Sequence, residues 1–514
     1  EIVFVLLSLL GMMAALIADK MRPGMVLFSV VVLFLCAGIL TPKEMLEGFS
    51  NKGMITVALL FLVSEGIRQS GTLGQVIKKL LPQGKTTVFK AQLRILPSVA
   101  FISAFLNNTP VVVIFAPIIK HWAKSVKLPA TKFLIPLSYV TILGGICTLI
   151  GTSTNLVVHG MILEAGYEGF TMFELGKVGI FIAIAGIIYL FIFSKRLLPD
   201  ARPDTAVPDE EVEEGEKLHR VEAVLGARFP GINKKLSDFN FQRHYGAEVK
   251  EIKTRNGQRY VDHLEDVVLR EGDTLVVMAD DTFIPTWGES SVFVLLTNGN
   301  DPDTSGKKKR WLALILLVLM IVGATVGELP ATKEMFPDIK LDMFFFVCIT
   351  TIIMAWTNIF PARKYTKYIS WDILITIACA FAISKAMVNS GVADCVAGFI
   401  IGLSDDYGPH VLLAILFVIT NLFTELITNN AAAALAFPLA LSISAQLGVS
   451  PTPFFVVICM AASASFSTPI GYQTNLIVQG IGNYKFTDFV RIGLPLNIIT
   501  FLISVILIPL IWNF

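Results

Sequence analysis

The sequence predicts an all-α polytopic membrane protein made of inverted repeats, with two re-entrant hairpins, two broken helices and a small α+β cytoplasmic insertion. Three observations predict this fold class: apolar runs of membrane-spanning length, self-similarity at an offset near 320 residues, and a charged stretch between the two copies. The 514-residue chain is 54% hydrophobic and only 16% charged, which excludes an ordinary soluble globular protein. Its net charge of +1 gives no indication of a nucleic-acid partner, so none is expected.

Ten apolar segments have the composition of membrane-spanning helices. They cover residues 2–18, 25–40, 55–67, 133–163, 178–193, 311–326, 343–356, 373–387, 454–466 and 492–512. The first segment has no basic region before it and no cleavage site, so we expect a first span rather than a signal peptide.

Basic residues are distributed unevenly between the two sets of loops that alternate along these spans. The loops at 19–23, 66–95, 120–132, 358–370 and 480–491 hold seventeen Lys and Arg, whereas those at 42–53, 161–178, 328–342, 386–416 and 447–452 hold five. The positive-inside rule therefore places the first set in the cytoplasm and both termini outside. The expected location is the cell inner (cytoplasmic) membrane, with multiple passes through the lipid bilayer.

Residues 201–306 are charged and polar, with an acidic run at 209–214. We therefore divide the chain into membrane repeat 1 (1–200), a cytoplasmic domain (201–306) and membrane repeat 2 (307–514). Strands are expected at 222–225, 247–253 and 266–279, with a helix within 231–245. The segment LREGDTLVVMADD (269–281) resembles the end of the TrkA-C (RCK C-terminal) domain, which implies regulation by a small ligand such as a nucleotide. A passive spacer is the alternative.

Four landmarks of the first half recur in the second half in the same order. Ser70-Gly71 recurs as Ser390-Gly391, Asn107-Asn108 as Asn429-Asn430, Pro117 as Pro438, and GTSTNL (151–156) as GYQTNL (471–476). The loop after the first Ser-Gly pair carries five basic residues by position 94, whereas the loop after the second carries three Asp and no basic residue up to position 416. The two copies are therefore expected to face opposite sides of the membrane.

Each copy also contains two interrupted apolar segments. Residues 95–120 are cut by NNTP at 107–110, and residues 411–445 are cut by TNN at 428–430. In the first segment an arm of about 12 residues reaches roughly 18 Å, a little over half of the hydrocarbon thickness, so the segment is expected to enter and return as a re-entrant hairpin. The second segment is expected to do the same from the opposite side. The runs GTSTN (151–155) and GYQTN (471–475) are expected to break one helix in each copy.

These interruptions bring polar groups to the middle of the membrane. Backbone carbonyls and the oxygens of Asn, Ser and Thr suit a hard cation such as sodium, while the N-termini of half-helices favour an anion. The alternative is that these side chains only form hydrogen bonds between helices.

At these residues the chain resembles the divalent anion:sodium symporter family (sodium/sulfate and dicarboxylate symporters) of the ion-transporter superfamily. That family has a Ser-Asn-Thr motif at each hairpin tip, and GGICTLIGTSTNL (144–156) is similar to its first helix break. The resemblance implies sodium sites at Ser103, Asn107, Asn108 and Gly151, and at Thr424, Asn429 and Gly471. It implies an anion site at Asn108, Thr109, Thr152, Asn430 and Gln473. It also implies a homodimer and elevator-type movement.

The helix breaks depart from the carboxylate transporters of that family. Those proteins usually have Thr-Pro-Pro, whereas this chain has TST at 152–154 and YQT at 472–474. Together with the insertion, these residues resemble the sulfate-transporter subgroup, so sulfate is expected ahead of a dicarboxylate or citrate.

Two other functions stay open. A cation/proton antiporter of the same superfamily needs a titratable carboxylate in the membrane, for which Glu65 and Glu425 are the candidates. A ligand-gated channel or transceptor would be governed by the inserted domain. No enzyme is expected, because the sequence has no nucleophile with a base and no phosphate-binding loop.

Overall fold

The computed structural model describes residues 1–18, 20–82, 84–200, 219–226, 228–254, 258–280, 283–287, 292–297, 307–403 and 408–514. The boundaries expected at 201 and 306 and the acidic run at 209–214 lie outside these residues.

The two halves are built from similar series of helices, ten in the described part of repeat 1 and eleven in that of repeat 2. In repeat 1 these are α1 (Ile2–Ala18), α2 (Pro23–Cys36), α3 (Pro42–Glu47), α4 (Lys52–Gln69), α5 (Thr72–Leu80), α6 (Val88–Ser103), α7 (Asn108–Ser125), α8 (Leu134–Gly145), α9 (Ser153–Glu164) and α10 (Gly176–Leu197). In repeat 2 they are α13 (Lys307–Gly327), α14 (Pro330–Met335), α15 (Met343–Trp356), α16 (Tyr365–Tyr368), α17 (Trp371–Asn389), α18 (Val392–Leu403), α19 (Gly408–Leu426), α20 (Asn429–Leu447), α21 (Thr452–Ser463), α22 (Gln473–Gly482) and α23 (Phe486–Ile511). The predicted polytopic, all-α class is confirmed.

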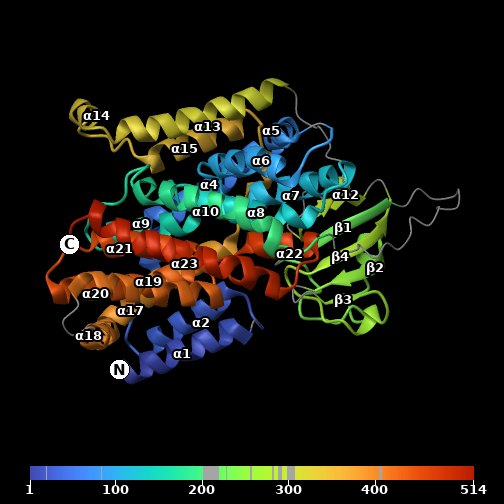
Figure 1. Cartoon of the computed structure of the whole chain (residues 1–514). Helices are drawn as coiled ribbons and strands as arrows, with labels where there is room; N and C mark the ends of the chain where they lie inside the picture. Colours follow the sequence, from blue (N-terminus) through green and yellow to red (C-terminus); the bar gives the residue numbers. More distant parts are fainter. Residues whose placement is uncertain are drawn as a thin grey trace, which may run out of the picture.

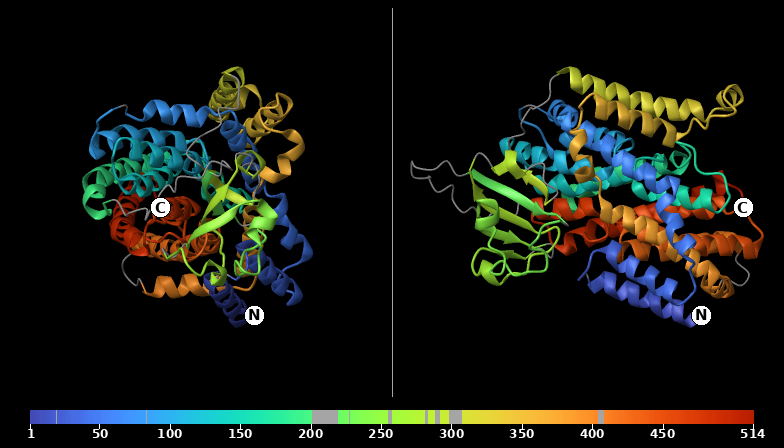
Figure 2. Two further views of the ribbon diagram at one scale, coloured as in Figure 1. Left: turned by 90° about the vertical axis from the view of Figure 1, so that its right-hand side faces the viewer. Right: turned by 180° about the vertical axis from the view of Figure 1, so that it is seen from behind.

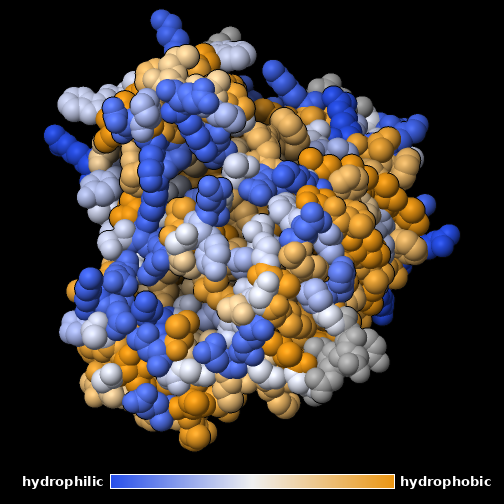
Figure 3. Space-filling view, turned by 90° about the vertical axis from the view of Figure 1, so that its left-hand side faces the viewer, coloured by the Kyte–Doolittle hydropathy of each residue, from blue (hydrophilic) through white to orange (hydrophobic). Residues whose placement is uncertain are grey.

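The outer helices have the surface of a membrane protein. Seven helices within the described residues are long and apolar enough to span a bilayer. In α23, exposed Leu and Ile side chains recur every four residues and so form one apolar stripe: Leu494, Ile498, Leu502 and Ile506. Exposed apolar surface of this extent needs lipid or protein to cover it. Hydrophilic side chains instead run across the end of the molecule, with hydrophobic ones along parts of its margin (Figure 3).

The insertion forms an antiparallel sheet with the strand order β3-β2-β4-β1-β5. Its elements are β1 (His219–Leu225), α11 (Phe241–Tyr245), β2 (Glu248–Lys253), β3 (Arg259–Tyr260), β4 (Thr274–Ala279), α12 (Phe283–Trp287) and β5 (Phe293–Thr297). The sheet lies at the end of the membrane part opposite both termini (Figures 1 and 2). This arrangement agrees with the predicted orientation, in which both termini face the side away from the insertion.

Two details of the insertion differ from prediction. The strand expected over 266–279 begins only at Thr274, because Gly272 has a φ of +85° and forms a turn before it. The helix expected within 231–245 is limited to Phe241–Tyr245, and Asn233, with a φ of +63°, lies in turns before it. In both places a residue in the left-handed region interrupts the regular element.

The interrupted segments form the centre of the membrane part. The hairpin α6–α7 enters from the end that carries the sheet, and the hairpin α19–α20 enters from the opposite end (Figures 1 and 2). Helices α8 and α9 are separated by residues 146–152, and α21 and α22 by residues 464–472. Two hairpins and two broken helices are therefore confirmed.

The hairpin arms are longer than the sequence predicts. The arms contain 16 and 18 residues in the first hairpin, against the 12 or so expected there. The second hairpin has 19 residues in each arm, a little more than the predicted segment 411–445 provides on either side of its TNN run. The uninterrupted apolar run of the first arm begins only at residue 95, whereas α6 also includes Lys90 and Arg94 at its outer end. Charged side chains there reach water while the backbone stays helical.

Helices α6 and α8 pack with their backbones in close contact at Gly144. A Cβ at this position would lie 2.1 Å from the carbonyl oxygen of Ala100. We expect Gly144→Ala to lower the unfolding temperature of the detergent-purified protein, by a free energy of about 1–3 kcal/mol from overpacking. Gly11→Ala is the matched control, since its Cβ would meet no atom within 4 Å and the change favours the helix. Equal unfolding temperatures of the two variants would contradict this packing.

Candidate functional site

Four helices begin at the interruptions of the two repeats. Helix α7 follows Asn107 and α20 follows Thr428, while α9 and α22 follow Thr152 and Tyr472, both in extended conformation. The first four backbone N–H groups of an α-helix have no partner within the helix. Each of these four helix starts therefore presents N–H groups and a partial positive charge to its surroundings.

In repeat 1, the hairpin tip and the helix break are joined by side chains. Ser103 Oγ donates to Asn108 Oδ1 (2.7 Å), and the N–H of Gly151 donates to Thr148 Oγ1 (3.1 Å). Asn155 Nδ2 donates to the carbonyl oxygen of Thr148 (2.9 Å). Asn155 Oδ1 is buried and has no hydrogen-bond partner among the described residues.

Repeat 2 has the same contacts at an offset of 320 or 321 residues. Thr424 Oγ1 donates to Asn429 Oδ1 (2.8 Å), the N–H of Gly471 donates to Thr468 Oγ1 (3.3 Å), and Asn475 Nδ2 donates to the carbonyl oxygen of Thr468 (3.2 Å). Here Asn475 Oδ1 is not free, because it accepts from Ser138 Oγ (2.7 Å).

These contacts correct one landmark of the repeat. Within the internal sequence repeat, Asn107-Asn108 is matched with Asn429-Asn430. The structure pairs Asn108 with Asn429, since each is the first residue of its helix and accepts from a hydroxyl five residues earlier. The correct offset at the tips is 321 residues, and Thr109 then corresponds to Asn430.

The two repeats meet through Tyr472. Asn108 Nδ2 in the first hairpin tip donates to the Tyr472 hydroxyl in the second helix break (2.6 Å). The same hydroxyl lies 3.0 Å from Thr152 Oγ1 in the first break. All three side chains are buried, at 0%, 9% and 2% exposure respectively. The hydroxyl therefore links a tip and a break of repeat 1 to repeat 2.

A second contact joins the other tip and break. Ser153 Oγ and Thr154 Oγ1 both donate to Asn430 Oδ1 (3.2 Å each). Thr109 Oγ1 lies 3.4 Å from Gln473 Oε1, and Gln473 is exposed. The starts of α7, α9, α20 and α22 thus lie together.

The structure brings together all five residues predicted to bind the anion. Asn108, Thr109, Thr152, Asn430 and Gln473 are all connected to the opposite repeat by the contacts above. The predicted cation residues Ser103 and Asn108, and Thr424 and Asn429, are also paired.

Asn107 is the predicted site residue that lies apart. It lines a cleft that also includes Ser153 and is bounded by α4 and α13, and its side chain does not cap α7. Tyr472 is outside the predicted site, because the contacts of its hydroxyl with the other repeat cannot be read from the sequence. Its place in the GYQTN break was visible in the sequence, but its partners were not.

Glu65 does not contact this site. It lies on α4 and pairs with Arg68 (2.6 Å) and with Gln69 (2.6 Å) on the same helix. Glu425, on α19, lies beside the second break, where the backbone N–H of Ser467 donates to it (2.9 Å). Of the two carboxylates considered for proton transport, only Glu425 adjoins the interrupted helices.

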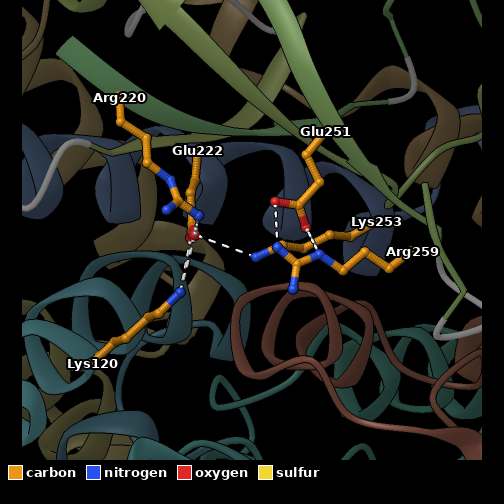
Figure 4. A network of polar contacts seen from close by, with 6 residues as sticks. All are labelled: Lys120, Arg220, Glu222, Glu251, Lys253 and Arg259. Carbon is orange, nitrogen blue, oxygen red and sulfur yellow. Dashed lines mark hydrogen bonds and ion pairs between the residues drawn. The ribbon is translucent and has the colours of Figure 1, made fainter. Parts of the chain in front are cut away.

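An ion pair joins the inserted sheet to the first hairpin, and a second one within the sheet shares its carboxylate (Figure 4). Lys120 on α7 lies 3.0 Å from Glu222 on β1, and Lys253 on β2 lies 3.4 Å from the same carboxylate. Burial raises the pKa of Glu222, but Lys120, Lys253 and Arg220 outweigh it and lower this pKa to about 2. A carboxylate with a lowered pKa stays ionised, and keeps its stabilising effect, until the pH falls toward that pKa. Glu222 is therefore ionised and paired throughout the physiological pH range.

The sheet also contacts the second broken helix. A Cβ on Gly480 of α22 would lie 3.5 Å from Thr274 Cβ of β4, and Gly272 lies against Leu476 of the same helix. Close by in the sheet, Arg259 donates to the buried Glu251 (2.8 Å; Figure 4). The insertion therefore touches α7 and α22, two of the four helices that begin at the candidate site.

We expect Tyr472→Phe to reduce transport about 5- to 100-fold, because the buried amide of Asn108 would lose its acceptor, at a cost of about 1–3 kcal/mol. The maximal rate and the half-saturating concentrations of cation and anion would be measured in proteoliposomes. Tyr484→Phe is the control, since this buried hydroxyl donates to the carbonyl oxygen of Thr131 (2.5 Å) away from the helix starts. Unchanged kinetics in Tyr472→Phe would show that the link between repeats is dispensable.

Comparisons with known proteins agree with this architecture. The family model described as "Citrate transporter" matches residues 13–443 and 335–514. An uncharacterized transporter of Synechocystis is 30% identical, with 94% of this chain and 93% of that protein covered. Sodium/sulfate cotransporter 2 of Chlamydomonas reinhardtii is 30% identical over 54% of this chain and 31% of its own length. The sodium-dependent dicarboxylate transporter SdcS of Staphylococcus saprophyticus is 25% identical over 28% of each chain.

Proposed function

The chain belongs to the citrate transporter family, and on that premise we propose that it is a sodium-coupled symporter of a small divalent anion, with sulfate as the substrate. The sodium/sulfate cotransporter among its relatives supports both the cation and the anion. The dicarboxylate transporter supports sodium as well, and favours a dicarboxylate or citrate as the second candidate substrate.

The convergence of four helix starts carries the anion part of the proposal. Each start contributes a partial positive charge of roughly half an elementary charge and unpaired N–H groups. The side chains there are Asn, Thr and Gln, which donate hydrogen bonds without adding charge. Donors of this kind, at helix N-termini, bind sulfate and carboxylate alike.

Neutral oxygens beside the helix starts carry the cation part. We assign one sodium to Ser103, Asn108 and the backbone of Gly151, and another to Thr424, Asn429 and the backbone of Gly471. Hydroxyl, amide and carbonyl oxygens are the ligands that hard cations prefer. The unpaired Asn155 Oδ1, 0% exposed, adds an available oxygen in repeat 1. Asn107, predicted for the same set, lines the cleft and forms the approach to it.

Transport would proceed by alternating access. The transport unit comprises α6–α9 and α19–α22, and it moves against a scaffold made of the early helices α1–α4 and α13–α17. Exposed apolar side chains on the scaffold, such as Ile315, Leu319 and Val322 of α13, fit an inner-membrane homodimer with elevator-type movement. Residues 201–306, similar to TrkA-C domains, would regulate this movement from the cytoplasm by binding a small ligand such as a nucleotide.

Uptake into proteoliposomes containing the full chain tests this function. Radiolabelled sulfate, succinate and citrate would be compared with external sodium, potassium or choline. We expect saturable sulfate uptake that requires an inward sodium gradient. Uptake of succinate or citrate instead would select the second substrate class. Sulfate uptake that is indifferent to sodium would defeat the coupling, and sodium flux driven by pH alone would identify an antiporter.

A further inference from the structure

The two repeats differ in polarity at three equivalent positions in and beside the helix breaks. Repeat 1 has Ala104, Gly145 and Cys147, and repeat 2 has Glu425, Ser465 and Ser467 at the equivalent places. The backbone is the same in both, because Thr148 Oγ1 donates to the carbonyl oxygen of Ala104 just as Thr468 Oγ1 donates to that of Glu425. Repeat 2 thus carries a carboxylate and two hydroxyl groups at positions where repeat 1 has neither.

Backbone N–H groups, an amide and the additional hydroxyls lie around the Glu425 carboxylate. Backbone N–H groups of Ser467 and Thr468 donate to its two oxygens (2.9 Å each), and Ser465 Oγ lies 3.5 Å away. Asn497 Nδ2, from α23, donates both to Glu425 Oε1 and to Ser467 Oγ (2.8 Å each). Three elements, α19, the second break and α23, therefore meet at this carboxylate.

Two groups at this location lack the partner that their chemistry requires. Asn497 is 6% exposed, and its Oδ1 has no hydrogen-bond partner in the described part of the chain. The nitrogen of the same amide donates to Glu425 and to Ser467, so the unpaired oxygen belongs to a side chain that already contacts the carboxylate. Within the same residues, no Lys, Arg or His forms an ion pair with Glu425. A carboxylate at membrane depth is costly without a counter-charge.

We propose that Glu425, Asn497 Oδ1, Ser465 Oγ and Ser467 Oγ bind a third cation, which repeat 1 cannot hold. One carboxylate with neutral oxygens suits a hard monovalent ion such as sodium, since no nitrogen or sulfur ligand is present at the cluster. Glu425 follows Thr424, a residue of the second proposed sodium site, so the two ions would lie side by side in the transport unit. The role of this third cation in transport rests on the proposed function. The binding of the cation does not, because it can be measured without transport.

The number of cations moved per anion tests the link to transport. Three sodium ions with one divalent anion carry one net positive charge, so uptake by the wild-type protein should be accelerated by an inside-negative potential. In Glu425→Gln two sodium ions should accompany the anion, and uptake should lose its dependence on the potential. Ser465→Gly/Ser467→Cys, which restores the residues of repeat 1, should raise the half-saturating sodium concentration by about tenfold or more. Glu65→Gln, outside the cluster, should retain wild-type stoichiometry.

A binding measurement separates this inference from the proposed function. The unfolding temperature of the detergent-purified full chain would be measured against sodium, with choline at constant ionic strength. We expect wild type and Glu65→Gln to respond to lower sodium concentrations than Glu425→Gln and the Ser465→Gly/Ser467→Cys variant. Identical sodium responses and unchanged stoichiometry in both cluster variants would overturn the third site. A response to pH but not to sodium, lost in Glu425→Gln, would overturn it in favour of a proton site. Absence of sulfate uptake by the wild type would count against the proposed function alone.

Discussion

Cross-linking the inserted sheet to α22 is expected to stop transport. In the double variant Thr274→Cys/Gly480→Cys, the two Cβ atoms would lie about 3.5 Å apart, within the range of disulfide bonds. Under oxidation we expect sodium-driven anion uptake to fall to about a tenth or less, and to recover after reduction. Uptake would be measured in proteoliposomes, together with the fraction of cross-linked protein on non-reducing gels.

The expected loss follows from the two sets of contacts that the insertion makes. It touches the transport unit through Thr274 and through the Lys120–Glu222 pair. It touches the scaffold through Asn233 Nδ2, which donates to the carbonyl oxygen of Lys20 (3.1 Å) in the loop between α1 and α2. If the transport unit moves against the scaffold, at least one set of contacts must break in every cycle. A disulfide fixes the first set of contacts in place. The proposed regulatory ligand of the insertion would act on these same contacts.

The single variants Thr274→Cys and Gly480→Cys are the controls under the same oxidation. They also account for the six native cysteines, which are free thiols in this structure. Full cross-linking with an unchanged rate of uptake would show that the insertion travels with α22 and does not restrain it.

The architecture of the membrane part could be predicted because its signals are local. Charged loops mark the sides of the membrane, and the polar runs NNTP, TNN, GTSTN and GYQTN mark the interruptions. The lengths of the hairpin arms could not be predicted from apolar runs, because α6 extends through Lys90 and Arg94. Pairing the Asn residues of the two tips by identity shifts the register by one residue, because the structural equivalence depends on where each helix begins.

The candidate site could be predicted in its composition but not in its pairing. The repeat placed Asn108, Thr152, Asn430 and Gln473 in interrupted segments, but no pattern in one chain shows that each tip contacts the break of the other repeat. Tyr472 illustrates the limit. Its aromatic ring breaks the similarity to Thr152 in sequence, while in the structure its hydroxyl lies 3.0 Å from that same threonine.

The contact between repeats gives the second large effect, because Asn108 serves both proposed ligands. We expect Asn108→Ala to reduce sodium-driven uptake by about 100-fold or more, since its removal leaves Ser103 and Tyr472 without their buried partner and takes away a cation ligand. Both the half-saturating sodium concentration and that of the anion should rise.

Asn430→Ala is the informative comparison. Asn430 accepts from Ser153 and Thr154 but is assigned to the anion alone, so its loss should raise the half-saturating anion concentration about tenfold while leaving that of sodium near the wild-type value. A double-mutant cycle then isolates the link between the repeats. Asn108→Ala combined with Tyr472→Phe should cost less than the sum of the single losses, by about 1 kcal/mol or more, because the two side chains share one hydrogen bond. Strict additivity would mean that the two residues act independently, and the repeats would then have to be coupled through the backbone of the breaks.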